Sequence, residues 1–393
     1  MRIGIDASCW WSRRGFGRFT RELLIAMFEE ERGHEFYLFV DRPPEPEMLR
    51  PNIHIVQVEL SQHVTEAAVA EGSRSVKDIW AFTRSVSKYP LDVLFFPAVY
   101  SWFPAPLRLP MVVTLHDAIA EHFPDLIFPD KKGRLLWSLK MKLARWQASR
   151  IMTVSEAAKK EIVEYLHIKP DVIDVVSEAA DPRFKPMLDV DERLAARKRA
   201  SLPGEVRLIV YVGGLAPHKN IPGLLNGLSQ AVERGGIDDV HLALVGDLDG
   251  DGFHSHYEEL KEIVQADSRL IDRVHFTGFV SDDDLVTLYS DSLAVTLPSF
   301  SEGFGLPAIE AMACGVPVLA SSAGSIPEVV GDAGLYFDPH KVEQITNAIH
   351  QLATDRDTLN DLRLKASQRA AQFTWSKAAK LAFDCLEGAV GKQ

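Results

Sequence analysis

The sequence has few cysteines and no long apolar run, and both absences narrow the class of protein. The three cysteines, Cys9, Cys314 and Cys385, lie far apart and form no C-x-x-C pair. So sparse a count fits a reducing compartment and argues against a disulfide framework or a zinc site. No stretch reaches about 18 consecutive apolar residues, and the start, MRIGIDAS, leads into a strand pattern rather than a signal peptide. We therefore expect a cytoplasmic protein, at most bound to the inner face of the membrane.

The chain also lacks an excess of positive charge. Its formal net charge is −12, so no electrostatic surface for nucleic acid is expected over the whole chain. With 46% hydrophobic and 25% charged residues, the composition is that of a globular protein. Because one hydrophobic core rarely grows past about 250–300 residues, the length of 393 residues predicts two domains.

Short apolar runs alternate with helical periodicity throughout the sequence, which predicts buried parallel strands in βαβ units and hence doubly wound α/β domains. The predicted strands are Arg2–Ala7, Phe36–Val40, His54–Val58, Val93–Pro97, Met111–Leu115, Arg150–Val154, Val172–Val176, Arg207–Val212, His241–Val245, His275–Phe279, Leu293–Leu297, Val316–Ala320 and Gly334–Phe337.

The charged stretch from Asp181 to Gly204 is the predicted boundary, because the strand pattern restarts at Arg207. The predicted domains are residues 1–182, joined by a C-terminal helix at about 375–393, and residues 183–374. Ligands of open α/β sheets lie beyond the carboxyl ends of the strands, so two facing sheets predict a site in a central cleft.

The segment from Pro298 to Gly315 carries the clearest chemical signal. It follows a strand and enters a helix whose first turn is favoured by Pro307. The helix amides and dipole can bind an anion such as a diphosphate, and the carboxylates of Glu302 and Glu310 can accept hydrogen bonds from sugar hydroxyls. The backbone groups expected at the anion are those of Gly303, Phe304, Gly305 and Leu306.

The sequence EGFGLPAIEAMACGVPVLAS, with its E-x7-E spacing, resembles the signature of the family-four retaining glycosyltransferases. The resemblance extends over nearly the whole chain and implies the GT-B fold, which is two Rossmann-like domains facing a central cleft. It further implies transfer of a hexose from a nucleotide-sugar donor. Glu310 would hold the ribose and Glu302 the donor sugar. The donor is expected to be a UDP-hexose such as UDP-glucose first and GDP-mannose second.

Three more positions of the second half match the family pattern. Lys219, after strand Arg207–Val212, corresponds to the lysine on the donor diphosphate. The family's arginine position is occupied by Gly214, so either His218 or the Gly214 amide is expected to compensate. The backbone at Phe279 and Val280 would contact the nucleobase, while core packing of the Phe279 side chain stays open. Ser281 and the three aspartates after it suggest either a helix cap, which we favour, or a metal site.

In the first half, the turn containing Gly15 and Gly17 is similar to the family's loop at the diphosphate and acceptor. His116, at a strand end, corresponds to the histidine beside the donor sugar and the anomeric centre. Asp117 is either a helix cap or a sugar ligand. Arg150 and Ser155 resemble acceptor-side residues, with a helix cap as the alternative for Ser155.

The resemblance thus implies His116, Lys219 and Glu302 as the reacting side chains, with no metal and no other cofactor. The expected acceptor is a hydroxyl group of a glycan or a lipid-linked sugar in polysaccharide biosynthesis. Two enzyme alternatives are a sugar-nucleotide epimerase and an inverting transferase, and both would require a general base such as Asp117. A sugar-binding protein without catalysis is the third alternative.

The stretch from Lys131 to Arg150 reverses the overall charge, with seven basic residues and no acidic one. Leucines and tryptophans are interleaved, at Leu135, Leu136, Trp137, Leu139, Leu143 and Trp146. Such a helix is typical of segments that lie on membrane surfaces. The alternative is a helix packed on the core with a solvated basic face.

Overall fold

A computed structural model describes residues 1–61, 63, 75–128, 130–248 and 256–391. The chain folds into two compact units, Met1–Glu178 with Thr374–Gln393, and Ala179–Phe373. The predicted divisions were after residues 182 and 374. The charged piece between the two strand patterns contains helix α8 (Val190–Arg199), at the beginning of the second unit.

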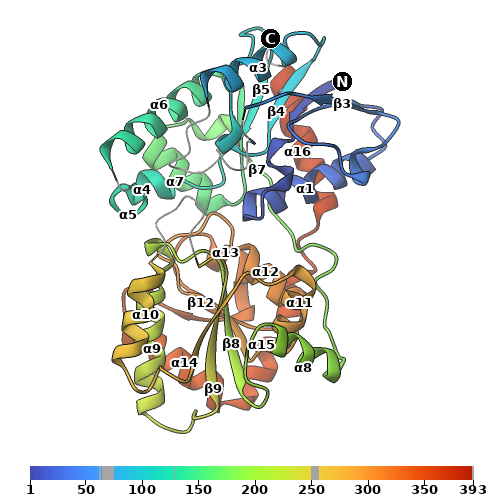
Figure 1. Ribbon diagram of the computed structural model, residues 1–393. Coiled ribbons are helices and arrows are strands. Elements are labelled where there is room, and N and C mark those ends of the chain that lie inside the picture. Colours follow the sequence, from blue (N-terminus) through green and yellow to red (C-terminus); the bar gives the residue numbers. More distant parts are fainter. Residues whose placement is uncertain (62, 64–74, 129, 249–255, 392–393) are drawn as a thin grey trace. The chain divides into compact units, whose positions relative to one another are not determined.

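The first unit is built on a parallel sheet with the order β3-β2-β1-β4-β5-β6-β7 in its described residues (Figure 1). Its strands are β1 (Arg2–Asp6), β2 (Glu35–Val40), β3 (Ile53–Gln57), β4 (Val93–Phe96), β5 (Met111–Thr114), β6 (Arg150–Thr153) and β7 (Ile173–Val175). Its helices are α1 (Gly15–Glu29), α3 (Val76–Val86), α4 (Ile119–His122), α5 (Pro124–Ile127), α6 (Lys131–Gln147), α7 (Glu156–Leu166) and α16 (Trp375–Val390).

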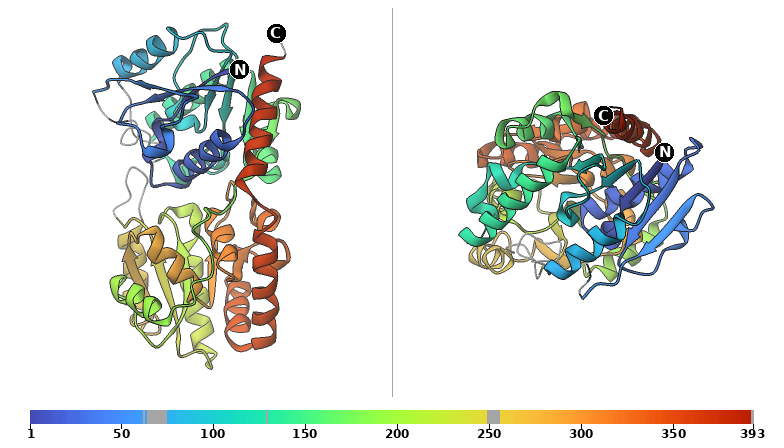
Figure 2. Two further views of the ribbon diagram at one scale, coloured as in Figure 1. Left: turned by 90° about the vertical axis from the view of Figure 1, so that its right-hand side faces the viewer. Right: turned by 90° about the horizontal axis from the view of Figure 1, so that it is seen from above.

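The C-terminal helix α16 packs against α1 in the first unit (Figure 2). Its apolar face is buried, with Phe383 fully covered beside Phe36 and His34. The end of the chain therefore completes the core of the unit with which the chain begins, as predicted for a helix that returns to the first domain.

The second unit has the sheet order β10-β9-β8-β11-β12-β13. Its strands are β8 (Arg207–Val212), β9 (Val240–Val245), β10 (Val274–Gly278), β11 (Ala294–Leu297), β12 (Val318–Ser321) and β13 (Gly334–Phe337). Besides α8, its helices are α9 (Ile221–Glu233), α10 (Tyr257–Ala266), α11 (Asp282–Ser290), α12 (Leu306–Ala313), α13 (Ile326–Val330), α14 (Val342–Thr354) and α15 (Arg356–Ala370).

Every predicted strand is present, with its ends shifted by no more than two residues. Most strand residues near the sheet centres are buried, which explains why their sequences are continuous apolar runs rather than alternating ones. The three cysteines are all buried, and none of them forms a disulfide. Within the described residues, no helix is long and apolar enough to cross a membrane.

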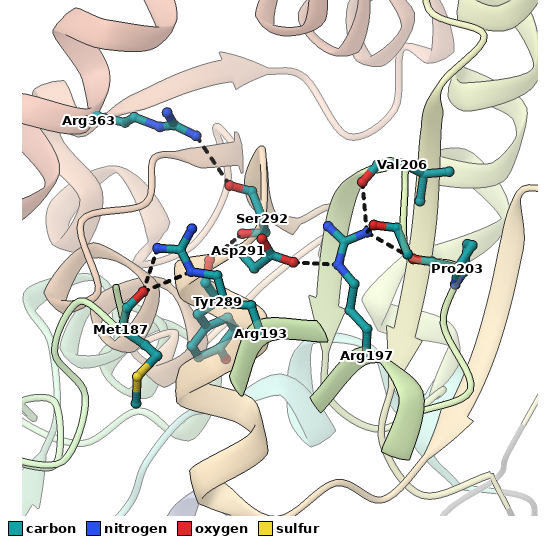
Figure 3. A network of polar contacts seen from close by, with 10 residues as sticks. Met187, Arg193, Arg197, Pro203, Val206, Tyr289, Asp291, Ser292 and Arg363 are labelled. Carbon is teal, nitrogen blue, oxygen red and sulfur yellow. Dashed lines mark hydrogen bonds and ion pairs between the residues drawn. The ribbon is translucent and has the colours of Figure 1, made fainter. Parts of the chain in front are cut away.

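A buried arginine fastens α8 to the rest of the second unit (Figure 3). Arg197 is 5% exposed and pairs with Asp291, which follows α11. It also donates hydrogen bonds to the carbonyl oxygens of Pro203 at 2.9 Å and Val206 at 2.8 Å. Nearby, the Ser292 hydroxyl donates to the Tyr289 carbonyl at 2.7 Å. This network fixes the C-terminal end of α11, whose Tyr289 reaches the candidate site.

The strand order identifies where each sheet can hold a ligand. The direction in which successive strands are added to the sheet changes between β1 and β4 in the first unit and between β8 and β11 in the second. At such a point the connections leave to opposite faces, and the loops beyond the carboxyl ends separate to form a crevice. The loops after β8 and β11, and those after β1, β4 and β5, are therefore the candidate regions.

Candidate functional site

The two loops at the β8/β11 switch point are joined by an ion pair. The Lys219 ammonium lies 2.8 Å from both carboxylate oxygens of Glu302. The Ser299 hydroxyl donates to the Glu302 Oε1 atom at 2.6 Å. Two residues that the sequence predicted separately are thus in direct contact, and Ser299 is a third member that the prediction missed.

Glu302 is held in its ionised form by these neighbours. Burial by itself would raise the pKa of Glu302, but Lys219 and the hydrogen bond from Ser299 outweigh it and lower the pKa below its ordinary value. A carboxylate that stays ionised only accepts hydrogen bonds, which suits a partner rich in hydroxyl groups.

Helix α12 begins next to this pair. Its N-cap, Gly305, has φ of 99°, a left-handed conformation that strongly favours glycine. The loop before α12 is held by the segment before α13, because the Ser325 hydroxyl donates to the Phe304 carbonyl at 2.9 Å. At the start of α12, Pro307 has no amide hydrogen and the Ala308 amide donates to the Gly305 carbonyl at 2.9 Å, so the Leu306 amide, together with the helix dipole, offers an anion site.

Glu310 lies one turn further along α12 and is buried, with 3% exposed. The Tyr289 hydroxyl lies 3.4 Å from its Oε2 atom. Tyr289 belongs to α11, so the network of Figure 3 also holds the helix that carries this contact of Glu310.

Gly214 occupies the position of the family's arginine, and His218 is the nearby side chain that was expected to compensate for it. His218 is 9% exposed, and burial lowers its pKa to about 3, with Lys219 adding to the effect. The lowered pKa favours the neutral imidazole, so compensation by His218 would come from a hydrogen bond rather than from a charge. An added Cβ at Gly214 would meet no atom within 4 Å. The second unit therefore has room for a side chain at this position, and crowding does not explain the absence of the arginine.

The residues after β10 present an exposed aromatic ring. Phe279 is 59% exposed, so the alternative of core packing was wrong. Ser281 caps α11 by accepting from the Asp284 amide at 3.1 Å, which confirms the cap. Two of the three aspartates form ion pairs with arginines, Asp282 with Arg183 and Asp284 with Arg199. The described residues contain no group of three or more potential metal ligands.

In the first unit, His116 lies directly after β5 with both ring nitrogens near acceptors. Its Nε2 atom is 3.0 Å from the Pro97 carbonyl oxygen, and its Nδ1 atom is 3.5 Å from Glu178 Oε1. The Phe19 and His116 rings form a T-shaped contact with 4.8 Å between ring centroids. Glu178 was not predicted, although it follows the carboxyl end of β7 and so lies at the same edge of the sheet.

The glycine turn serves the fold at one of its two positions. Gly15 begins α1, but a Cβ on Gly17 would come within 2.2 Å of the Ser12 carbonyl oxygen. The Gly17 amide also donates to the Arg14 carbonyl at 2.9 Å. Gly17 is therefore required by packing, and its amide is engaged within the loop.

The remaining acceptor-side candidates have structural roles. Asp117 accepts from the Ile119 amide at 3.0 Å at the start of α4, and Ser155 accepts from the Ala158 amide at 2.9 Å at the start of α7. Arg150 is at the amino end of β6, opposite the carboxyl edge, and binds Asp174 through two nitrogens. Its placement at the acceptor site was wrong, because Arg150 begins the strand at the edge opposite the carboxyl ends.

Helix α6 contacts its unit through only part of its surface. Of its residues, only Met141 and Ala144 are buried, and Trp137 is partly covered, donating to Glu121 at 2.8 Å. The helix therefore packs on the core through this part of its surface, as the alternative held, while five other large apolar side chains are exposed. They are Leu135 (69%), Leu136 (52%), Leu139 (53%), Leu143 (41%) and Trp146 (67%).

Comparison with known proteins agrees with both halves of the fold. The family model described as glycosyl transferases group 1 matches residues 192–372, and that of glycosyltransferase family 4 matches residues 13–184. A solved structure of Anabaena Alr3699/HepE in complex with UDP and glucose superimposes with a TM-score of 0.72 at 20% identity, covering 98% of this chain and 99% of that chain. WaaG, a glycosyltransferase involved in lipopolysaccharide biosynthesis, has a TM-score of 0.72 at 15% identity, covering 98% and 99%. At these identities the likeness establishes the GT-B fold.

Proteins with similar sequences are also glycosyltransferases. The serotype-specific mannosyltransferase WbdA of Escherichia coli is 32% identical over 248 residues, 62% of this chain but 29% of the relative. The O-antigen chain mannosyltransferase B of the same species is 32% identical over 277 residues, 67% of this chain and 66% of the relative. The matched region is thus less than a third of WbdA. With two family models that together match residues 13–184 and 192–372, the chain belongs to the group 1, family 4 glycosyltransferases.

Proposed function

We propose that the protein is a retaining hexosyltransferase that uses a nucleoside-diphosphate sugar in the synthesis of a glycan. One observation carries the proposal: Lys219, Glu302 and the start of α12 meet at the β8/β11 switch point. A lysine and helix amides suit a diphosphate, and an ionised carboxylate beside them suits the hydroxyls of a sugar. Membership of the family supports the same chemistry.

In this proposal the second unit binds the donor. Glu310 accepts from the ribose hydroxyls, Lys219 and the start of α12 bind the diphosphate, and Glu302 holds the hexose. The backbone after β10, at Phe279 and Val280, contacts the base. The sequence ranks a UDP-hexose first and GDP-mannose second, while the names of the Escherichia coli relatives support mannose as the transferred sugar.

The first unit supplies His116 and the acceptor site. The proposed acceptor is a hydroxyl group of a carbohydrate or a lipid-linked sugar. Double displacement would require a carboxylate nucleophile at the anomeric carbon. Because Glu302 and Glu310 are assigned to hydroxyl binding, we favour a front-face route. In it the departing phosphate oxygen accepts the proton of the acceptor hydroxyl, without a metal, while His116 and Lys219 stabilise the developing charge.

The experiment for this function is a thermal-shift panel of nucleotide sugars, followed by NMR of the product. A donor at 100 times its Kd stabilises the folded state by about 2.7 kcal/mol. This should raise Tm by several degrees, at roughly 2–4 °C per kcal/mol for domains of this size. Retained anomeric configuration and turnover in EDTA are expected. An inverted product, or activity lost in EDTA and restored by manganese, would contradict the proposed mechanism.

The exposed face of α6 supports a second part of the proposal, contact with an anionic membrane. Five exposed apolar side chains lie on a helix that also carries exposed Lys131, Lys132, Arg134, Lys142 and Arg145. In a chain of net charge −12, this local positive charge is complementary to anionic lipid. A lipid-linked acceptor would then be presented at the same surface.

The membrane contact is testable by sedimentation with vesicles of anionic or neutral lipid. Replacing Lys131, Lys132 and Lys142 by glutamine should weaken binding by about 1 kcal/mol per charge. Leu139→Ser should also weaken binding, whereas Leu364→Ser, at a position 64% exposed on α15, serves as the matched control. Wild-type protein that stays in the supernatant at low salt would contradict the contact.

A further inference from the structure

His116 and Glu178 form a buried pair in which both ring nitrogens of the histidine have a neighbouring oxygen atom. The Pro97 carbonyl only accepts hydrogen bonds, so the Nε2 atom 3.0 Å away carries a proton. The Nδ1 atom and Glu178 Oε1 are 3.5 Å apart. A proton on one of these two atoms makes this contact favourable, whereas two bare lone pairs at this distance would repel. Neither ring nitrogen is then available to take a proton from an acceptor hydroxyl.

The same contacts fix the direction of the ring. The side chains of His116 and Glu178 are 11% and 5% exposed, so water contributes little to holding the ring. Phe19 covers the imidazole from α1, with its ring at 88° to the imidazole. Pro97 follows β4, His116 follows β5 and Glu178 follows β7. Three separate loops at one sheet edge thus hold one side chain.

We propose that Glu178 is a positioning residue, which holds the His116 ring in one orientation through its contact with the Nδ1 atom. This inference rests on the proposed function, because it gives His116 its purpose as a fixed group beside the donor. His116 then acts through its fixed position, and not as a general base.

The test is a double-mutant cycle on turnover. Glu178→Ala should lower kcat by about 10²-fold with little change in the donor KM, the scale expected when a reacting group is misplaced. Glu178→Gln, which keeps the size and one acceptor oxygen, should recover part of this loss and guards against a folding defect. In a His116→Ala background, Glu178→Ala should change kcat by less than about twofold, because its effect passes through the absent ring.

The matched control is the second histidine–glutamate pair of this unit. His122 on α4 and Glu161 on α7 are 3.6 Å apart, with side chains 31% and 16% exposed. Glu161→Ala removes a carboxylate beside a different histidine of the same unit, one to which the proposal gives no role, and it should leave kcat unchanged. Equal losses of kcat in the Glu161 and Glu178 variants would overturn the positioning role.

A readout without donor separates this inference from the proposed function. In spectra of protein with 15N-labelled histidine, the His116 ring signals are assigned by their loss in His116→Ala. Glu178→Ala should shift the His116 Nδ1 signal, and Glu161→Ala should not. An unmoved Nδ1 signal, or additive losses in the cycle, would overturn the inference. Absence of turnover by the wild type with any donor would instead overturn the proposed function, and the spectra would still decide whether Glu178 orients His116.

Discussion

At the scale of single residues, the ion pair between Lys219 and Glu302 links two proposed contacts to one donor. Lys219 is expected on the diphosphate and Glu302 on the sugar, and in the structure the two side chains bind each other. A bound diphosphate therefore has to share the lysine with Glu302. This coupling distinguishes Glu302 from Glu310, which contacts Tyr289 instead.

Glu310→Ala should weaken the binding of nucleoside diphosphate and donor alike, because it removes charged hydrogen bonds to the ribose worth about 1.5–3 kcal/mol. Glu302→Ala should leave the affinity for nucleoside diphosphate unchanged or higher, since it releases Lys219, while turnover falls. Calorimetry with UDP and GDP measures both. Equal loss of nucleotide affinity in the two variants would refute this division of roles.

Gly214→Arg should tighten the binding of nucleoside diphosphate. An added Cβ at Gly214 meets no atom within 4 Å, and an arginine there would restore the family's charge with a bond worth about 1.5–3 kcal/mol. This corresponds to an increase of about tenfold or more in affinity. Gly214→Gln is the neutral control of similar length. If both variants bind UDP and GDP like the wild type, position 214 does not face the diphosphate.

His218 makes stability depend on pH. Burial, followed by Lys219, lowers its pKa from 6.5 to about 3, so between these values the unfolded chain binds a proton that the folded chain does not. The stability from this residue is therefore complete above pH 6.5 and is lost as pH falls toward 3. Between pH 7 and 5 the loss should be about 2 kcal/mol. Denaturant unfolding of wild type and His218→Gln at both pH values should show a smaller difference in the variant.

At the scale of elements, helix caps and turns follow local sequence, while the attachment of a helix depends on distant partners. Ser281 and Ser155 cap the helices that follow them. Helix α8 is different, because it is highly charged and is fastened by Arg197 to residues up to 94 positions away.

Arg197→Met should destabilise the protein by about 3–5 kcal/mol, since it leaves the Asp291 carboxylate without its buried partner. Chemical denaturation monitored by tryptophan fluorescence measures the change. The control is Arg199→Met on the same helix, whose side chain is 49% exposed in its pairs with Glu192 and Asp284, and little change is expected there. Similar effects of the two substitutions would show that the Arg197 network of Figure 3 contributes no more than a surface pair.

At the scale of the whole molecule, the chain leaves its first unit at Glu178 and returns to it at Thr374. The final helix therefore stabilises a sheet whose strands end almost 200 residues earlier in the chain. Phe383→Ala should cost about 3–5 kcal/mol, because it opens a cavity beside Phe36 and His34. Leu381→Ala, at a position 43% exposed on the same helix, should change stability by no more than about 0.5 kcal/mol. Thermal unfolding of both variants checks the contrast, and a neutral Phe383→Ala would show that α16 adds little to the unit.

The sequence by itself determined the strands, the helix starts and the class of the fold. These features depend on short patterns: apolar runs for strands buried on both faces, Ser281 as an N-cap, and Pro307 in a first turn. Each involves residues within about one helical turn or one strand, so local periodicity is sufficient. The E-x7-E spacing likewise placed Glu302 and Glu310 near one helix end.

Only the tertiary structure decided which of these groups meet. Lys219 and Glu302 are 83 residues apart, and their contact follows from β8 and β11 being neighbours in the sheet. Glu178 reaches His116 because the strands before them end at the same edge, whereas Arg150 begins its strand at the opposite edge. The exposure of Phe279 and of the α6 leucines, and the neutral state of His218, depend on what packs around each side chain. Burial and strand order are properties of the assembled fold, and no local pattern specifies them.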